Sequence, residues 1–170
     1  MTPPSPLESD ALMLWRLDQA RSGLVWDSGE GAYRAGGRWN SRGVRAVYAA
    51  LDPATAILEV AVHTGFAALD AVAHVLTTAR ITAAGWVRVV SAAEIPNPRW
   101  LRPGMVGAGQ QAFGDALLRA HPFVVIPSVV SAHSWNAIFA PAVARGLYDQ
   151  VAREAFALDP RLHPPGRVGA

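Results

Sequence analysis

A glycine-rich segment ends in residues whose types suit an anionic ligand. The stretch GEGAYRAGGRWNSRG, residues 29–43, holds five glycines and includes Gly37, Arg38, Trp39 and Asn40 in succession. Because glycine loses more backbone entropy on ordering than any other residue, we expect an irregular loop that can approach a ligand closely. A guanidinium group offers a planar fork of donors that suits a phosphate or pyrophosphate. Arg38 is therefore a candidate phosphate ligand, the alternative being a surface arginine in a mobile loop.

The same segment matches neither of two common nucleotide-binding motifs. Arg34 stands where the pattern Gly-x-Gly-x-x-Gly requires its third glycine, and no Gly-Lys-Ser/Thr ending of a P-loop follows. Any nucleotide bound here must be held in another way.

One carboxylate lies in an otherwise apolar helix. Asp52 and Pro53 predict a helix start, because Asp caps free N–H groups and Pro suits the first helical position, and Gly65 predicts the end. Glu59 lies within AILEVAV, and this helix has no other ionisable residue before His63. A carboxylate is costly to bury without a partner. The helix has almost no polar face, so we expect Glu59 to be buried and functional rather than solvated.

Three further residues are candidates by type and position. Tyr48 lies in a predicted strand, where its ring could stack on a nicotinamide or adenine or simply fill the core. Ser128 follows Pro127 in a predicted apolar strand, where a serine is also a common turn former. Asn136 lies in a predicted loop after that strand and could orient a ligand hydroxyl or form a turn.

Serine-hydrolase and metal chemistry both lack their motifs. No Gly-x-Ser-x-Gly pattern occurs, and the five histidines show neither a base for a given serine nor the spacing His-Glu-x-x-His. The absence of cysteine excludes disulfides and thiolate metal ligands. We therefore expect no metal site.

Composition and charge indicate a single globular domain. The chain has 170 residues, 51% hydrophobic and 16% charged, and we expect one domain over 11–158 between flexible tails at 1–10 and 159–170. All 15 basic residues are arginine, they form no run, and the net charge is only +2, so the pattern does not indicate direct nucleic-acid binding. No apolar stretch is long enough to span a membrane, and because residues 1–15 lack a basic segment followed by an apolar run, we expect no secretory signal. We expect a cytoplasmic protein.

Strands and helices are interspersed in the predicted order. Strands are expected over 11–17, 44–50, 71–80, 86–90 and 123–130, and helices over 53–64 and 108–120. Because there is no regular strand–helix–strand rhythm, the pattern favours an α+β fold.

Taken together, these segments resemble the RES domain, which is named for a characteristic Arg, Glu and Ser. The matching pieces are Trp15-Arg16, GEGA, GGRWNSRG, VYAA, AILEVAVH and IPSVVSAHSWN, within residues 12 to 141. The resemblance implies an ADP-ribosyltransferase-like fold, in which a split antiparallel sheet with surrounding helices encloses an NAD cleft.

The resemblance also implies which residues form the site. The catalytic set falls on Arg38, Tyr48, Glu59 and Ser128, and the NAD contacts fall on Gly37, Arg38, Trp39, Asn40, Tyr48 and Asn136. Ser131 and Ser134 are close enough in sequence to be alternatives to Ser128.

The function implied by the resemblance is that of a toxin of a type II toxin–antitoxin pair. Such a toxin degrades NAD at the nicotinamide–ribose bond, by hydrolysis or with inorganic phosphate as co-substrate, which Arg16 or Arg42 would bind. The implied partner is an Xre-type antitoxin, and the toxin could form a homo-oligomer within that complex. Two alternatives stay open: a protein ADP-ribosyltransferase that uses the same NAD site, and a binding module that has lost the chemistry.

Overall fold

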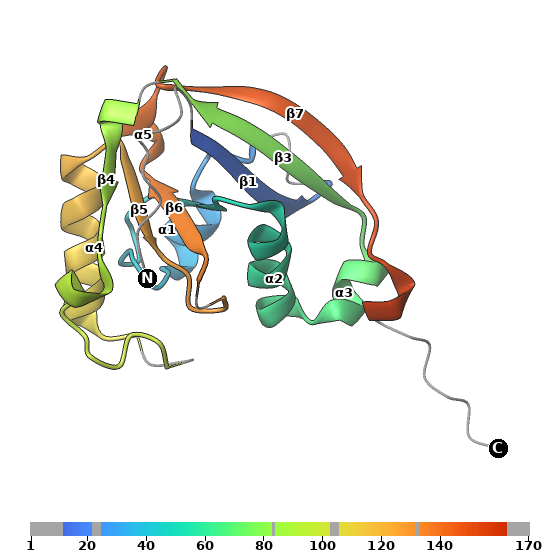
Figure 1. Ribbon diagram of the computed structural model, residues 1–170, viewed down its shortest axis with the longest axis horizontal. Helices are drawn as coiled ribbons and strands as arrows, with labels where there is room; N and C mark the ends of the chain where they lie inside the picture. Colours follow the sequence, from blue (N-terminus) through green and yellow to red (C-terminus); the bar gives the residue numbers. More distant parts are fainter. Residues whose placement is uncertain (1–11, 22–24, 83, 103–105, 132, 163–170) are drawn as a thin grey trace.

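A seven-stranded sheet forms the centre of the molecule (Figure 1). The computed structural model describes residues 12–162 except 22–24, 83, 103–105 and 132, so the predicted N-terminal tail, residue 11 and the end of the predicted C-terminal tail lie outside the described residues. The strands are β1 (Leu12–Gln19), β2 (Val47–Ala50), β3 (His74–Ile81), β4 (Val87–Val89), β5 (Phe123–Pro127), β6 (Trp135–Phe139) and β7 (Tyr148–Phe156). Their order in the sheet is β4-β5-β6-β2-β1-β3-β7, and only β4 and β5 pair in parallel.

The sheet divides between β1 and β2. These two strands share a single pair in register, Trp15 with Ala50, whereas β1 pairs with β3 along its full length from Leu12 to Gln19. Figure 1 shows β1, β3 and β7 curving away together from β4, β5 and β6. The α+β fold with a split, almost wholly antiparallel sheet is confirmed.

Five α-helices accompany the sheet in the described part of the chain. They are α1 (Glu30–Ala35), α2 (Pro53–Thr64), α3 (Phe66–Ala71), α4 (Ala108–Ala120) and α5 (Pro141–Ala144), with short 3-10 helices at Ala84–Trp86, Ala92–Glu94 and Pro160–Leu162. The bounds predicted for α2 are confirmed, because the Asp52 carboxylate accepts a hydrogen bond from the Thr55 backbone N–H at 2.8 Å. The predicted bounds of α4 are confirmed as well.

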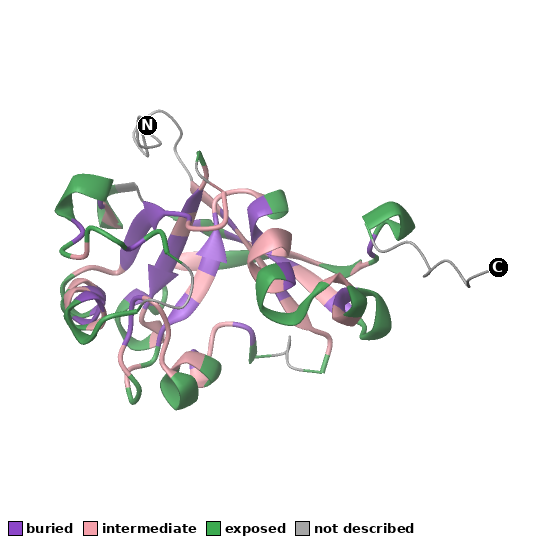
Figure 2. Cartoon of the chain, turned by 90° about the horizontal axis from the view of Figure 1, so that it is seen from below, coloured by how far each residue is buried: buried purple, intermediate pink, exposed green. Residues whose placement is uncertain are grey.

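Apolar side chains pack on both faces of the sheet. Figure 2 shows buried residues along the strands and exposed residues on the outer sides of the helices. Val124 and Ile126 of β5 pack with Leu118 of α4, while Phe123 and Val125 face the opposite core. The alternation fits a strand that is covered on both faces, which explains why β5 is buried along its whole length.

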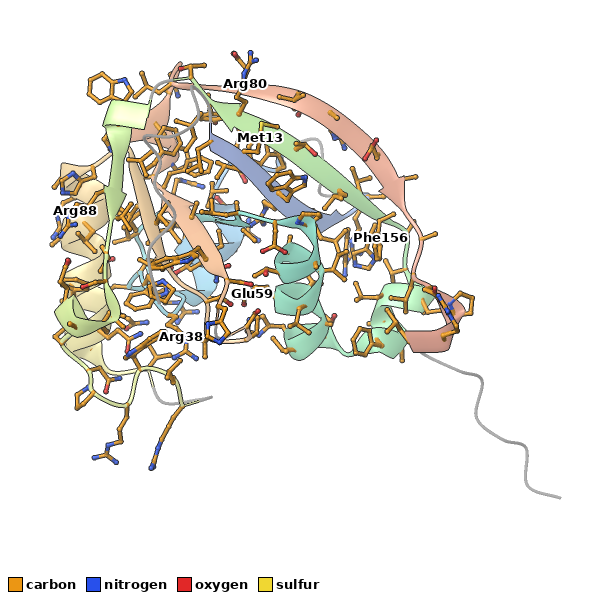
Figure 3. All side chains as sticks on the ribbon, viewed as in Figure 1. Met13, Arg38, Glu59, Arg80, Arg88 and Phe156 are labelled. Carbon is orange, nitrogen blue, oxygen red and sulfur yellow. The ribbon has the colours of Figure 1, made fainter. Side chains whose placement is uncertain are left out.

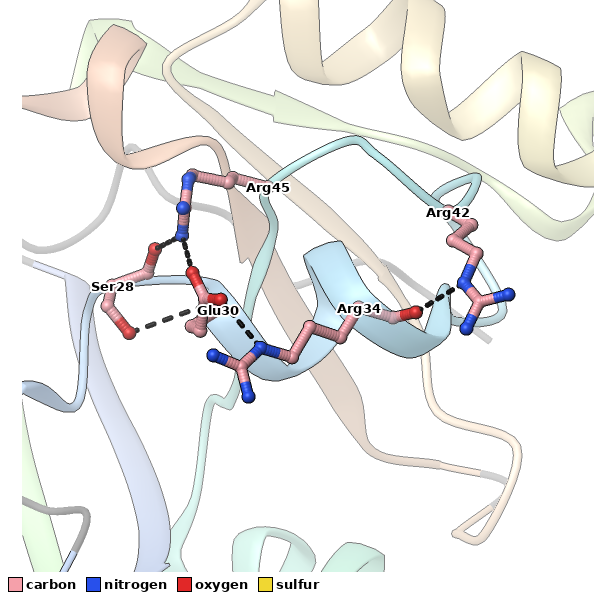
Figure 4. A network of polar contacts seen from close by, with 5 residues as sticks. All are labelled: Ser28, Glu30, Arg34, Arg42 and Arg45. Atoms are coloured by element: carbon pink, nitrogen blue, oxygen red, sulfur yellow. Dashed lines mark hydrogen bonds and ion pairs between the residues drawn. The ribbon is translucent and has the colours of Figure 1, made fainter.

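The predicted glycine-rich loop contains a helix. Helix α1 occupies Glu30–Ala35, and Figure 4 shows the network of polar contacts around it. Gly29 and Gly36 adopt positive φ angles of 63° and 72° at its two ends, which is where glycine is least costly. An ion pair between Glu30 and Arg34, one turn apart, supports the helix at 2.7 Å. The prediction of an irregular segment throughout 29–43 was therefore wrong.

Two further expectations need correction. Asn136 lies in strand β6 rather than in a loop, and β6 pairs with both β2 and β5. The prediction missed this strand because a short central strand shows little hydrophobic periodicity. The strand expected from residue 71 begins at His74, since Phe66–Ala71 forms helix α3.

Candidate active site

A cavity of about 240 Å³ lies where the sheet divides, between α2 and the strands. Its lining comes from four elements: Trp15, Arg16 and Leu17 of β1; Tyr48, Ala49 and Ala50 of β2; Ala56, Glu59, Val60 and His63 of α2; and Asn136 of β6. Three of the predicted site residues, Tyr48, Glu59 and Asn136, therefore meet at one cavity.

The Glu59 carboxylate is held by two side chains through one of its oxygens. Asn136 Nδ2 donates to Glu59 Oε1 at 2.5 Å, and Ser128 Oγ donates to the same oxygen at 3.2 Å. Among the described residues no hydrogen bond engages the second oxygen, Oε2. Glu59 is half-buried rather than buried as predicted, because it borders the cavity instead of the core.

One buried polar atom of Asn136 has no hydrogen-bond partner among the described residues. Its Nδ2 is used by Glu59, whereas its buried Oδ1 has no hydrogen-bond partner among the described residues. A buried acceptor without a partner costs free energy, so a ligand that donates a hydrogen bond there would relieve the cost.

Ser128 is the second hydrogen-bond partner of the Glu59 carboxylate. The side chain is buried, and its Oγ also accepts hydrogen bonds from the backbone N–H groups of Val130 and Ser131, both at 3.2 Å. Ser131 and Ser134 bond to each other at 2.8 Å instead of to Glu59. Ser128 is thus the serine that positions Glu59, and it does not line the cavity itself.

Tyr48 contributes its ring to the cavity and its hydroxyl to the neighbouring loop. The hydroxyl donates to Asn40 Oδ1 at 2.7 Å and accepts from the Trp39 N–H at 3.0 Å. Burial raises the pKa of the Tyr48 phenol well above its usual value, so the group remains protonated at neutral pH.

Gly37 provides the space that this tyrosine needs. A Cβ atom at position 37 would lie 2.4 Å from the Tyr48 hydroxyl and 2.6 Å from Asn40 Oδ1, which is too close for any side chain. The Gly37 carbonyl accepts from Gln111 Nε2 of α4 at 2.9 Å. The structure therefore explains this glycine by the close approach of Tyr48.

Trp39 and Asn40 are enclosed by protein. Asn40 is fully buried, and its Nδ2 lies within hydrogen-bond distance of the carbonyls of Ala32, Ser41 and Val44. The Trp39 ring is buried against Trp100. Neither side chain lines the cavity, and both hold the loop against the rest of the protein. Their contact with NAD stays a prediction.

Arg38 does not line the cavity, but it lies close enough to Glu59 and Tyr48, which do, for their charges to affect it. It is half-buried, and its Nη1 donates to the Trp100 carbonyl at 2.7 Å. Burial lowers the pKa of the Arg38 guanidinium, and the negative charge of Glu59 opposes that shift. Both residues are labelled in Figure 3, on the side of the molecule where α2 and the end of β6 face each other.

Of the two further arginines considered from the sequence, only Arg16 reaches the cavity. Its Nε and Nη2 donate to the Asp18 carboxylate at 2.9 and 2.7 Å, and its Nη1 donates to the Tyr48 carbonyl at 2.6 Å. This contact bridges β1 and β2 at the point where their ladder ends. Arg42 is exposed and donates to the Arg34 carbonyl instead (Figure 4).

Helix α4 holds the loop in place through residues that sequence reasoning missed. Asp115 Oδ1 accepts from the Ser41 N–H at 2.9 Å. A Cβ at Gly114 would lie 2.0 Å from the Trp39 carbonyl oxygen, so the loop rests directly on the helix backbone. A glycine in the middle of an otherwise regular helix was the available signal.

The described residues contain neither a membrane-spanning helix nor a cluster of metal ligands. No helix among them is long and apolar enough to cross a membrane. Within the same ranges, no group of three or more His, Asp or Glu side chains could hold a metal ion.

Comparison with known proteins shows the family and the fold of this chain. Residues 13–159 match the family model described as RES domain. A protein named Toxin Res from Pseudomonas putida is 32% identical over 157 residues, which cover 89% of this chain and 99% of that protein. In the crystal structure of the M. tuberculosis MbcT–MbcA toxin–antitoxin complex, one chain matches with a TM-score of 0.69 and 20% identity, over 86% of this chain and 85% of that chain. The ADP-ribosyltransferase-like fold expected from the sequence is confirmed, and the chain belongs to the RES domain family.

Proposed function

We propose that this protein is the toxin of a toxin–antitoxin pair and that it consumes NAD by cleaving the bond between nicotinamide and ribose. The observation that carries the proposal is the Glu59 carboxylate, which is fixed through one oxygen at a cavity and has the other oxygen free of protein partners among the described residues. The similarity to Toxin Res and to a chain of a toxin–antitoxin complex supports the biological role.

The chemistry calls for a carboxylate that is positioned before the substrate arrives. As the nicotinamide–ribose bond breaks, positive charge develops at the ribose C1′ and its ring oxygen. A fixed negative charge stabilises this state more than the ground state, because it does not have to reorganise during the reaction. Asn136 and Ser128 provide that fixation by binding Oε1 of Glu59. Oε2 would face the developing cation or a ribose hydroxyl.

The remaining groups suit the other parts of the dinucleotide. The Arg38 guanidinium has donors beyond the one given to Trp100 and would bind a phosphate of NAD. The Tyr48 ring lines the cavity and would pack against the nicotinamide. The unpaired Oδ1 of Asn136 would accept a hydrogen bond from a ribose hydroxyl or from the carboxamide.

The acceptor and the partner complete the proposal. If inorganic phosphate is the co-substrate, Arg16 is the basic group that would bind it, because it lines the cavity and Arg42 does not. The partner would be an Xre-type antitoxin that blocks the cleft in the cytoplasm, as the family resemblance implies.

The test is to incubate the purified, antitoxin-free chain with NAD, with and without inorganic phosphate, and to follow nicotinamide and ADP-ribose products. Release that requires phosphate, with a phosphorylated ADP-ribose product, would establish phosphorolysis. Release without phosphate would establish hydrolysis. Folded protein that releases no nicotinamide in either buffer would contradict the proposal, and labelling of a protein by the ADP-ribose moiety would instead identify a protein ADP-ribosyltransferase.

A further inference from the structure

A second ionisable residue of α2 borders the same cavity as Glu59. His63 follows Glu59 by four residues, one helical turn, and both side chains line the cavity. His63 is exposed to solvent at the last turn of the helix, whereas Glu59 is half-buried in its middle. The cavity therefore has a carboxylate held inside it and an imidazole at its rim.

The elements around His63 carry other ionisable side chains besides Glu59. On β1, Arg16 forms an ion pair with Asp18. On β2, the Tyr48 hydroxyl is bonded within the loop, and burial raises its pKa. Helix α3, which packs against α2, carries Asp70 as its single ionisable residue. Imidazole is the side chain that takes up a proton most readily near neutral pH.

The proposed reaction needs such a group when water is the acceptor. When the C1′–N bond of NAD breaks, nicotinamide leaves with the bonding electron pair as a neutral molecule. The acceptor forms a new C1′–O bond. A water molecule must lose a proton as this bond forms, whereas hydrogen phosphate attacks through an oxygen that already carries negative charge and needs no base. Glu59 already receives hydrogen bonds from Ser128 and Asn136 and faces the developing cation, so a different group must take that proton.

We propose that His63 is the general base that takes a proton from water, as the acceptor, at the rim of this cavity. The neutral imidazole takes the proton as the C1′–O bond forms and then returns it to solvent, to which His63 is open. This inference rests on the proposed NAD-cleaving function and adds the residue that handles the acceptor.

The experiment compares wild type with His63→Gln, which keeps a polar side chain of similar reach but cannot act as a base. We expect kcat for nicotinamide release to fall by about 100-fold with little change in the KM for NAD. In wild type kcat should decline as the pH is lowered from about 8 to about 5, and this decline should be absent in His63→Gln. The matched control is His121→Gln, a histidine outside the cavity lining, which should behave as wild type. These effects are expected in reactions without phosphate, where water is the acceptor. Added phosphate should narrow the difference between His63→Gln and wild type, and release by wild type that requires phosphate would overturn the role of His63.

A nucleophile that has no proton to lose can distinguish a role of His63 as a base from a structural role. Azide needs no deprotonation to attack C1′, so about 100 mM azide should restore nicotinamide release by His63→Gln to near the wild-type rate. It should also flatten the pH profile of wild type, a readout that does not depend on the variant folding. A His63→Gln enzyme with wild-type kcat and pH profile, or one that azide does not restore, would overturn the role of His63 while leaving NAD cleavage intact. Wild-type protein that releases no nicotinamide would overturn both.

Discussion

The two halves of the site differ in what their polar groups are doing. In the loop of residues 36–41, the polar side chain of Asn40 and most backbone groups are committed to protein partners. At the cavity, Glu59 Oε2 and the buried Asn136 Oδ1 have no partner among the described residues. The loop is therefore held by hydrogen bonds within the protein and positions Arg38, whereas the cavity has polar atoms that can bind a ligand.

The motif GGRWN therefore combines two roles, ligand binding and stabilisation of the loop, in different residues. GGRWN was predicted to be one anion-binding element, and its arginine has side-chain donors beyond the one given to a protein carbonyl among the described residues. The glycine, tryptophan and asparagine hold the turn against Tyr48 and α4. Substitutions at the cavity should therefore change activity without changing stability, and substitutions in the loop should change stability first.

The largest effect on activity is expected from Glu59→Gln. The substitution keeps the shape of the side chain and removes its charge, so kcat for nicotinamide release should fall by about 100-fold or more. Since Glu59 is half-buried at a cavity, the midpoint of thermal unfolding should stay close to wild type. Wild-type turnover in this variant would remove Glu59 from the mechanism.

The next largest effect is expected from Gly114→Ala, which changes the packing of the loop on α4. The new Cβ would lie 2.0 Å from the Trp39 carbonyl oxygen, so the loop must move away from α4. We expect the free energy of unfolding to fall by about 1–3 kcal/mol, measured by urea denaturation, together with a loss of activity.

The control for that variant lies in the same helix. Gly109 has no atom within 4 Å of its would-be Cβ, so Gly109→Ala should leave activity unchanged and should not destabilise the protein. Equal effects of the two substitutions would contradict the close packing of the loop on α4.

A third prediction contrasts two arginines near the loop. Arg38→Lys loses the planar fork of donors, so the Kd for NAD should rise by about tenfold in calorimetry. Arg42→Lys, which changes an exposed side chain outside the cavity lining, should leave the Kd unchanged. The same Kd in both variants would argue against phosphate binding by Arg38.

The smallest effect on activity is expected from Tyr48→Phe. The ring that lines the cavity remains, but Asn40 Oδ1 and the Trp39 N–H lose their partner. Stability should fall by about 1–3 kcal/mol, while kcat should change by no more than about fivefold. A loss as large as that of Glu59→Gln, in a variant that remains folded, would give the hydroxyl a direct part in catalysis.

Local signals in the sequence were sufficient for part of the site. The cap at Asp52 and the stop at Gly65 define α2, and the apolar neighbours of Glu59 mark it as unusual. Long-range pairing decided the rest. The register of β2 with β6 sets Asn136 opposite Ala50, just before α2 begins, which brings it to Glu59. No property of residues 128–136 alone specifies that register.

The enclosure of Trp39 and Asn40 shows the same limit. Both lie in a segment whose composition suits a ligand-binding loop, but α4, about 70 residues later in the chain, covers it. Whether a polar side chain faces a ligand or the protein depends on such packing.

A crystal structure of the Glu59→Gln variant with NAD would show directly whether the reacting bond lies in this cavity. We expect the nicotinamide–ribose bond beside residue 59, the nicotinamide against Tyr48, and a phosphate on Arg38. NAD bound at a different surface, with this cavity empty, would contradict the proposed site.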